Sequence, residues 1–209
     1  SVTPNGLNDP QLGPTVVAIS TGQVLTAKGP NSTTGSSGSN FHLPGDAALA
    51  ALLGTTLANT FDAAILTFQF TCTGTSIHMG YLFASEEYNE FVKSAFTDAM
   101  AIWLDGTNIA WVPGTSPQKL ISINTVNRGK PLGTPPFQNP QFYTSNDIGT
   151  PAPIIFSQED GWVGLNPAGG RLAINATVVP GQVYALRSGV VDVSYGNHDS
   201  VMYVGARTL

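Results

Sequence analysis

Short runs rich in β-branched and aromatic residues follow one another from Ala63 to the end of the sequence. In residues 171–178 every even-numbered residue is apolar. Successive side chains of a β-strand point to opposite faces, so this period of two predicts strands with one buried face. The runs of this kind are Ile65–Thr73, Ser76–Ala84, Ala99–Leu104, Leu120–Asn124, Arg171–Val178, Val183–Val193 and Ser200–Ala206. Turn dipeptides such as Asp105-Gly106 and Pro180-Gly181 separate several of them.

The sequence before Ala63 predicts fewer elements. We expect a buried strand at Thr15–Ser20 and a weaker one at Gln23–Ala27. Asp46 is placed to cap a helix over Ala47–Leu53, which Gly54 would end. Residues 31–40 are polar and of low complexity, which predicts a loop.

Together these elements predict an all-β chain: a jelly-roll-like sandwich of two antiparallel sheets, with one short helix and long surface loops. We expect residues 15–209 to form a single domain. Residues 1–14 contain three prolines and no periodicity, which predicts an extended N-terminal arm that could donate a strand to a neighbouring molecule. Residues 130–153 are rich in Pro and Asn, which predicts a long excursion over the surface.

Charge is scarce in this chain and excludes several classes of partner. Asp, Glu, Lys and Arg make up 10% of the residues, against about 25% in typical soluble domains. The net charge of −5 argues against nucleic acid and anionic membrane surfaces, which both require a field of Lys and Arg. No apolar run is long enough to span a bilayer, so membrane insertion is not expected. The polar, weakly charged composition favours an extracellular or cell-surface location.

The single cysteine, Cys72, continues an alternating strand pattern, so we expect a buried thiol in the core. One cysteine cannot form a disulfide within the chain. The usual mark of an oxidising compartment is therefore missing from this sequence.

The few acidic residues gather near the ends of predicted strands. Glu86 and Glu87 directly follow one strand, Asp98 begins another, and Asp192 and Asp199 flank a loop near the C-terminus. In a sandwich, strand ends from distant parts of the sequence meet at one pole, so these five carboxylates could converge. Ca²⁺ takes six to eight oxygen ligands and would offset their mutual repulsion. The alternative is a solvated acidic loop together with Asp turn caps, because no EF-hand spacing is present.

The same acids give little support for catalysis. A glycosidase needs two carboxylates facing one sugar. Glu86 and Glu87 are adjacent, so in a strand they would point to opposite faces, although Glu87 with Asp98 remains an alternative pair. The three histidines form no metal-binding or catalytic motif, and no GxSxG sequence is present. We therefore expect a protein that binds or assembles and is not an enzyme.

Three aromatic residues are candidates for contacts with a ligand or another subunit. Trp111 and Trp162 lie beside predicted turns, and Tyr195 lies near the C-terminal loop. Exposed aromatic rings can stack on sugars or anchor a protein interface. Trp103, in contrast, lies within an apolar strand and is expected in the core.

Several strings resemble the choice-of-anchor L domain family. They are YLFASEEYNEFV (Tyr81–Val92), FTDAMAIWLDGTNIAWVPGT (Phe96–Thr115), ISINTVN (Ile121–Asn127) and VDVSYGNHDSVMYVGA (Val191–Ala206), with ISTG at Ile19–Gly22 and the pair Gly45-Asp46. The resemblance runs in order through residues 15–209. It implies a secreted prokaryotic surface protein with a β-sandwich fold and no established enzymatic activity. It also favours Ca²⁺ binding, because the acids named above lie in the matching strings.

Such domains commonly continue into an anchoring tail, whereas this sequence ends at Thr208-Leu209, shortly after its last predicted strand. We therefore expect a self-assembling surface filament or biofilm matrix subunit, a homopolymer or homo-oligomer stabilised by strand exchange through the N-terminal arm. The alternative is a Ca²⁺-dependent, lectin-like adhesion module that binds glycans.

Overall fold

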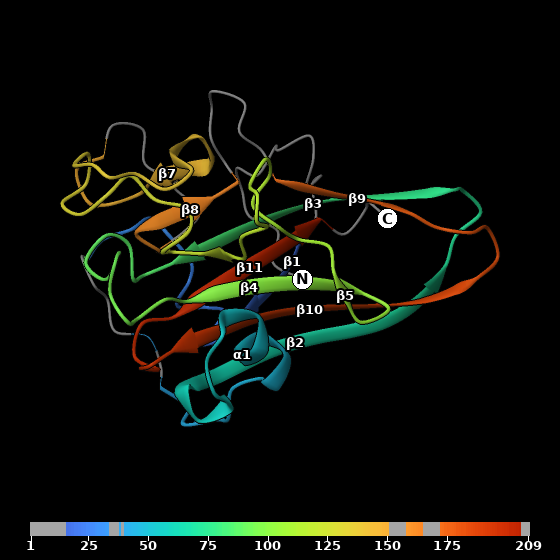
Figure 1. Ribbon diagram of the computed structural model, residues 1–209. Helices are drawn as coiled ribbons and strands as arrows, with labels where there is room; N and C mark the ends of the chain where they lie inside the picture. The colour runs from blue at the N-terminus through green and yellow to red at the C-terminus, as the bar shows by residue number, and fades with distance from the viewer. Residues whose placement is uncertain (1–15, 34–37, 39, 151–157, 165–171, 206–209) are drawn as a thin grey trace.

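The computed structural model describes residues 16–33, 38, 40–150, 158–164 and 172–205, which form two antiparallel β-sheets packed face to face (Figure 1). The strands are β1 (Val16–Ser20), β2 (Thr60–Thr71), β3 (Ser76–Ser85), β4 (Ala99–Leu104), β5 (Thr107–Asn108), β6 (Ile121–Ser122), β7 (Tyr143–Ser145), β8 (Gly161–Val163), β9 (Ala173–Thr177), β10 (Val183–Val193) and β11 (Ser200–Gly205). The helical elements are α1 (Ala47–Leu53) and two 3₁₀ turns, η1 (Leu57–Asn59) and η2 (Pro140–Phe142). This architecture confirms the predicted all-β fold.

Neighbouring strands within each sheet are mostly not consecutive in sequence, because the chain crosses repeatedly from one sheet to the other. The first sheet has the order β1-β11-β3-β8-β7, with β9 also paired to β3. The second sheet has the order β2-β10-β4-β5, with β6 also paired to β4. The long strands β3 and β10 are therefore central, whereas β1 and β2 each lie at a sheet edge. The predicted N-terminal arm, residues 1–14, lies outside the described residues.

The structure corrects several predicted boundaries. β2 begins five residues earlier than expected, at Thr60, because the polar start of this strand pairs with the end of β10. Residues 23–27 form turns instead of a strand. Only Ile121 and Ser122 are in a strand within the run expected at Leu120–Asn124. The excursion expected at residues 130–153 contains the short strand β7, which pairs with β8.

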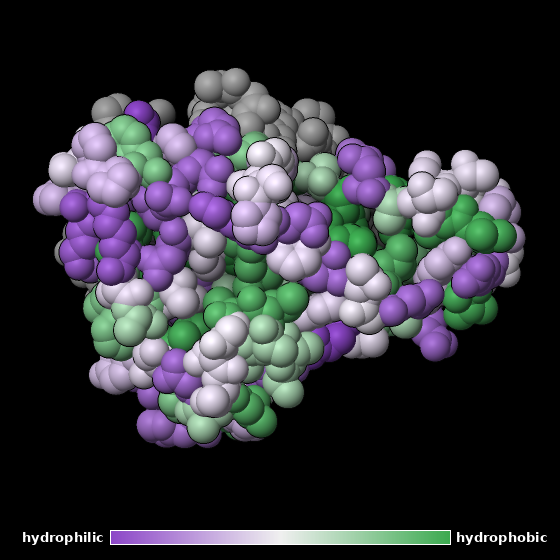
Figure 2. Space-filling view, viewed as in Figure 1, coloured by the Kyte–Doolittle hydropathy of each residue, from purple (hydrophilic) through white to green (hydrophobic). Residues whose placement is uncertain are grey.

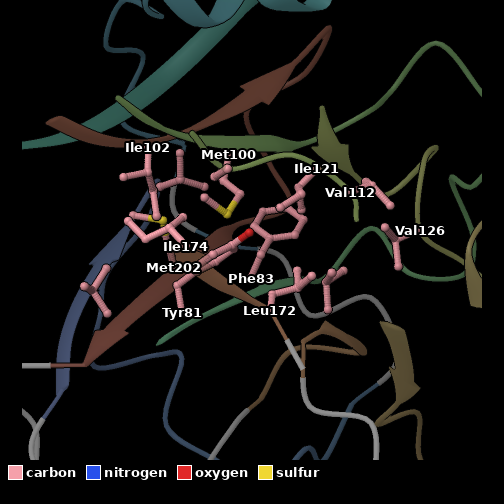
Figure 3. Close-up of a cluster of buried hydrophobic side chains, with 14 of the residues drawn as sticks. Tyr81, Phe83, Met100, Ile102, Val112, Ile121, Val126, Leu172, Ile174 and Met202 are labelled. Atoms are coloured by element: carbon pink, nitrogen blue, oxygen red, sulfur yellow. The ribbon is translucent and has the colours of Figure 1, made fainter. Parts of the chain in front are cut away.

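The inner faces of the two sheets form the main hydrophobic core (Figure 3). Tyr81 and Phe83 of β3 and Met202 of β11 come from the first sheet. Met100 and Ile102 of β4 come from the second sheet. Alternate residues of each strand reach this core, as the period of two in the sequence predicts.

The outer faces of both sheets are also largely covered, which explains why several strands are apolar throughout. On the second sheet, Leu49 of α1 packs against the cluster that contains Trp103, and Trp103 is 5% exposed as expected for a core residue. On the first sheet, Trp162 of β8 stacks on Tyr203 of β11 with ring centroids 5.2 Å apart. All six residues of β4 and of β11 are buried.

Helix α1 forms where the sequence predicts it. The Asp46 carboxylate accepts hydrogen bonds from the backbone N–H groups of Ala48 and Leu49, at 3.0 and 2.9 Å. Gly54 ends the helix with a φ of 70°, a left-handed conformation that glycine adopts without steric cost. Asp46 also forms an ion pair with Arg187 of β10, whose guanidinium lies over the Trp103 ring. The cap therefore ties the helix to the sheet beneath it.

Cys72 departs from its prediction. It lies just beyond β2, in the connection that leads from β2 of the second sheet to β3 of the first, and its side chain is partly exposed. The alternating pattern continues through Cys72 in sequence, but the strand ends at Thr71. The thiol consequently packs at the margin of a small apolar cluster and is not in the main core.

Candidate functional site

Four strands from the two sheets meet at one pole of the sandwich, and buried acidic residues gather there. In the first sheet, β3 ends at Ser85 directly opposite Ser200, where β11 begins. In the second sheet, β4 begins directly after Asp98, and β10 ends directly after Asp192. The pole therefore joins sequence segments that are more than a hundred residues apart.

The Asp98 carboxylate connects the two sheets. Its Oδ2 atom accepts hydrogen bonds from the hydroxyls of Ser85, at 3.1 Å, and Ser200, at 2.7 Å. Its Oδ1 atom accepts a longer hydrogen bond of 3.4 Å from the backbone N–H of Val193. Asp98 is 0% exposed, and burial raises the pKa of its carboxyl, although hydrogen bonds from Ser200 and Ser85 lower it in part.

Glu87 lies against Asp98 inside the same pole. Its Oε2 atom accepts a hydrogen bond of 3.2 Å from the backbone N–H of Asp98, and its own N–H donates to Ser85 Oγ at 3.0 Å. Burial, followed by the negative charge of Asp98, raises the pKa of the Glu87 carboxyl far above its ordinary range. Because two adjacent buried carboxylates repel each other, the pair favours states in which the two groups are not both charged.

Asp192 points into the same interior space. The residues on either side of it, Val191 and Val193, belong to the cluster on the outer face of the sheet, so the Asp192 side chain faces inward. It is 0% exposed, and neither carboxylate oxygen has a hydrogen bond of ordinary geometry among the described residues. Burial and then the charge of Asp98 raise its pKa, which the nearby Thr21 hydroxyl lowers in part.

Glu86 and Asp199 complete the set of predicted acids at this pole. Both are buried, and the backbone N–H of Glu86 donates to the backbone oxygen of Asp199 at 3.1 Å. The Asp199 carboxylate lies against two glycines: a Cβ atom at Gly22 would lie 1.5 Å from Asp199 Oδ2, and one at Gly38 would lie 2.0 Å from the carboxylate carbon. Asp199 is near enough to Asp192 to raise its pKa.

The pole therefore brings Glu87, Asp98, Asp192 and Asp199 together, with Glu86 beside them, and none of the five is more than 6% exposed. This burial differs from the solvated acidic loop considered as an alternative. Glu87 and Asp98 are also too buried to face a sugar, as a glycosidase pair must. Among the described residues, no three His, Cys, Asp or Glu side chains are arranged so that they could hold a metal ion as they stand.

Two serines and a threonine contribute to the site without having been predicted from the sequence. Ser85 and Ser200 bind Asp98, and Thr21 Oγ1 accepts a hydrogen bond of 2.8 Å from the backbone N–H of Ser200. Ser85 directly precedes Glu86, and Ser200 directly follows Asp199. A hydroxyl residue next to an acid at a strand end was the signal that could have identified both serines.

The three aromatic residues predicted to contact a ligand or subunit differ in how exposed they are. Trp162 is 0% exposed, so its expected position at the surface beside a turn is wrong: it stacks on Tyr203 within an apolar cluster formed by strands of the first sheet. Trp111 is partly buried, and its indole N–H donates to the backbone oxygen of Asn108 at 3.0 Å. Tyr195 is 46% exposed and lies against the edge of the Phe96 ring. Of the three, Tyr195 is the residue that a partner could reach most readily.

A shallow cavity of about 240 Å³ opens on the outer face of the second sheet, beside α1. Ala48, Thr67, Trp103 and Arg187 are among its lining residues. The Trp103 ring would be the natural stacking surface for a sugar, but the Arg187 guanidinium lies 4.4 Å from the ring centroid and covers it. This arrangement does not favour the glycan-binding alternative.

Strand β2 leaves one edge of the second sheet open. It pairs with β10 on one side. The start of its other side is occupied: Phe61 bridges to Pro44, and the N–H groups of Asp62 and Ala63 donate to Leu43 O at 3.0 Å and Pro44 O at 3.3 Å. The segment Ala63–Thr71, with the sequence AAILTFQFT, carries no charged residue. Beyond Ala63, the backbone groups that point away from β10 have no strand partner among the described residues, and such groups can pair with a further strand.

Comparison with known proteins identifies a single family. Residues 13–209 match the family model described as the Choice-of-anchor L domain. No curated protein and no solved structure matches the chain significantly. None of the described helices has the length and apolar character that crossing a membrane would require.

Proposed function

Because the chain belongs to the choice-of-anchor L domain family, a family of secreted and cell-surface proteins, we propose that it is a non-enzymatic structural subunit that associates with copies of itself outside the cell. The observation that carries this proposal is the open, uncharged edge of β2. Growth into a surface filament or matrix would require this edge and a second contact between copies.

An open edge strand is an unusual feature, because unpaired N–H and C=O groups bind other strands readily. Natural proteins commonly protect such edges with Lys, Pro or an inward-pointing charge. The segment Ala63–Thr71 has none of these, and the strand irregularity between Val190 and Asp192 lies next to its polar start only. The unprotected part of β2 is thus suited to pairing with another strand.

Exposed hydrophobic side chains border this edge. Ile65 in β2 is 39% exposed, and Leu57 in η1, just before the strand, is 47% exposed. Phe41 and Leu43 are 44% and 55% exposed, and their backbone N–H groups bind the carboxylate of Asp62 in β2. Figure 2 shows hydrophobic side chains at the surface in the region of α1 and the start of β2. A partner strand would cover apolar surface as well as satisfy backbone groups.

A second copy of the chain fits this edge better than a charged partner does. Two β2 edges can pair antiparallel around a twofold axis, because each supplies the same backbone pattern and no charge that would repel its copy. The low charge of the whole chain also reduces the cost of desolvating the contact. Such pairing closes as a dimer, so growth into a filament requires a second contact. The predicted N-terminal arm, residues 1–14, is our candidate for it.

Sedimentation velocity and negative-stain electron microscopy of the full chain test the proposal. We expect concentration-dependent dimers or longer assemblies. The double substitution Ile65→Lys and Gln69→Lys places like charges opposite each other across a β2–β2 contact and should give monomers. Thr177→Lys, at an exposed position of β9 in the other sheet, is the matched control and should assemble normally.

Two results would contradict the proposal: a wild-type chain that stays monomeric at every concentration, or a folded double variant that assembles as well as Thr177→Lys. Circular dichroism establishes that each variant is folded. Deletion of residues 1–14 should leave dimers but abolish fibres. If this deletion leaves fibre length unchanged, the arm is not the second contact.

A further inference from the structure

We propose that Asp98 and Asp192 bind one divalent cation, in the first place Ca²⁺, between the ends of β4 and β10, with Glu87 and the hydroxyls of Ser85 and Ser200 as further oxygen ligands. This site would fasten the two sheets together at the pole. The inference is independent of the proposed self-association.

The position of Asp192 is the first argument. It is a fully buried carboxylate whose oxygens both lack hydrogen bonds of ordinary geometry among the described residues. Its side chain points between the sheets toward Asp98, whose charge acts on it more strongly than that of any other acid. Thr21 is the one hydroxyl that acts on this carboxylate among the described residues, and a buried carboxylate so short of hydrogen bonds is costly unless it retains a proton or is neutralised by a cation.

The surrounding charges give the second argument. Glu87 and Asp98 are in direct contact, and Asp192 is buried at the same pole. None of the three is more than 1% exposed, so water screens their mutual repulsion poorly. A cation placed among them would therefore reverse the dominant electrostatic cost of this pole, as a bound metal ion does in other acidic sites.

The ligand types select the class of cation. The donors at the pole are carboxylate and hydroxyl oxygens, which hard cations such as Ca²⁺ and Mg²⁺ prefer over soft thiolate or imidazole sites. Ca²⁺ tolerates irregular coordination by six to eight oxygens, whereas Mg²⁺ demands a near-ideal octahedron. A site assembled from strand ends of two sheets favours the more tolerant ion.

Binding requires the side chains to rearrange. In the structure, Asp98 Oδ2 is engaged by Ser85 and Ser200, and no three acidic side chains of the described residues surround a common point. A cation would replace the hydroxyl hydrogens at Asp98, and the hydroxyl oxygens would then turn their lone pairs toward the ion.

Isothermal titration calorimetry of CaCl₂ into chelator-treated full-length protein tests the site directly. We expect one ion per chain, with a Kd in the range of about 0.1–1 mM that is typical of extracellular modules. In a thermal melt, free Ca²⁺ at about ten times Kd should raise Tm by about 3–6 °C relative to EGTA. MgCl₂ at the same concentration should raise it less.

The variant Asp192→Asn keeps the shape of the side chain and removes its charge. We expect it to fold, to melt in EGTA at or above the wild-type Tm, and to bind Ca²⁺ at least about tenfold more weakly. Asp105→Asn is the matched control: this Asp lies in an exposed turn with a φ of 46°, which Asn also tolerates, and it should keep the full response to Ca²⁺.

The proposal is overturned if calorimetry of the wild-type chain detects no binding at millimolar CaCl₂, or if Asp192→Asn responds to Ca²⁺ as the wild type does. If Asp192→Asn fails to fold, the same titration of Ser200→Ala decides in its place, since loss of one hydroxyl ligand should weaken binding. In that case, an unchanged Ca²⁺ affinity in Ser200→Ala would overturn the site.

Discussion

The backbone N–H of Asp98 donates a hydrogen bond of 3.2 Å to Oε2 of Glu87, so two buried acidic residues from different strand ends lie in direct contact. Glu87 follows β3 of the first sheet, whereas Asp98 precedes β4 of the second. The contact therefore belongs to the junction between the sheets. The protonation states of the Glu87 and Asp98 carboxyls should consequently affect the stability of the whole sandwich.

We predict that the metal-free protein loses stability as the pH rises from about 5 to 8. Burial raises the pKa of both carboxyls above their ordinary values of 4.5 for Glu87 and 3.8 for Asp98. A raised pKa means that the folded state holds protons that the unfolded state releases. Their stabilisation is therefore complete below the ordinary pKa and decreases above it, by at most about 1.4 kcal/mol per pH unit and group. Urea unfolding in EGTA across this range measures the slope.

Glu87→Gln provides the comparison for this prediction. Glutamine does not titrate, yet its amide can donate a hydrogen bond to Asp98 as a protonated carboxyl can. The free energy of unfolding of Glu87→Gln should depend less steeply on pH than that of the wild type. Identical slopes for the two proteins would show that Glu87 does not hold a proton in the folded state.

The sequence predicts a strand well only where the strand is long enough to show alternation between apolar and polar residues. β3, β4, β10 and β11 were predicted within one or two residues, because each has six or more residues and one face in the core. β5, β7 and β8 have only two or three residues each, too few to show alternation. Their formation depends on neighbouring strands that are distant in sequence, as when Trp162 of β8 pairs opposite Ala84 of β3.

The acidic pole was predictable only in outline. Strand ends in a sandwich must meet at its poles, so the sequence could suggest that Asp98 and Asp192 converge. Which acids lie in contact depends on sheet register, for example the pairing of Ser85 with Ser200 that brings both hydroxyls to Asp98. The hydrophobic pattern decides which face of a strand is buried, but no short turn joins β3 to β11 and fixes their register, so the residues around each acid do not reveal this pairing.

Gly161 should not tolerate a side chain. A Cβ atom there would lie 2.4 Å from Cγ and 2.6 Å from Cβ of Tyr88, which is fully buried and donates a hydrogen bond of 2.7 Å to the backbone oxygen of Val126. These atoms lie at the base of the Tyr88 side chain, so rotation of the ring cannot relieve the clash. We expect Gly161→Ala to lower the free energy of unfolding by about 1–3 kcal/mol.

Gly74→Ala is the control for this substitution. Gly74 lies in the β2–β3 turn, and the nearest atom to an added Cβ would be Ser76 O at 3.8 Å, an ordinary contact. Urea unfolding should show little change for Gly74→Ala. Equal stability of both variants would mean that the β8 segment shifts freely away from Tyr88.

Asp46 has two roles at α1 that substitutions can separate, because its carboxylate both caps the helix and pairs with Arg187. Asp46→Ala removes both interactions and should lower the free energy of unfolding by about 1–2 kcal/mol, the usual value of an N-cap. Asp46→Asn keeps an oxygen that accepts from Ala48 and Leu49 but loses the charge, so its loss should stay within about 1 kcal/mol. Thermal melts at low and high salt distinguish the contributions, because salt screens only the ion pair. The Tm of each variant is compared with that of the wild type at the same salt concentration. If both variants show the same deficit at low salt and no deficit at high salt, then the attraction to Arg187, and not the cap, holds α1 against the sheet.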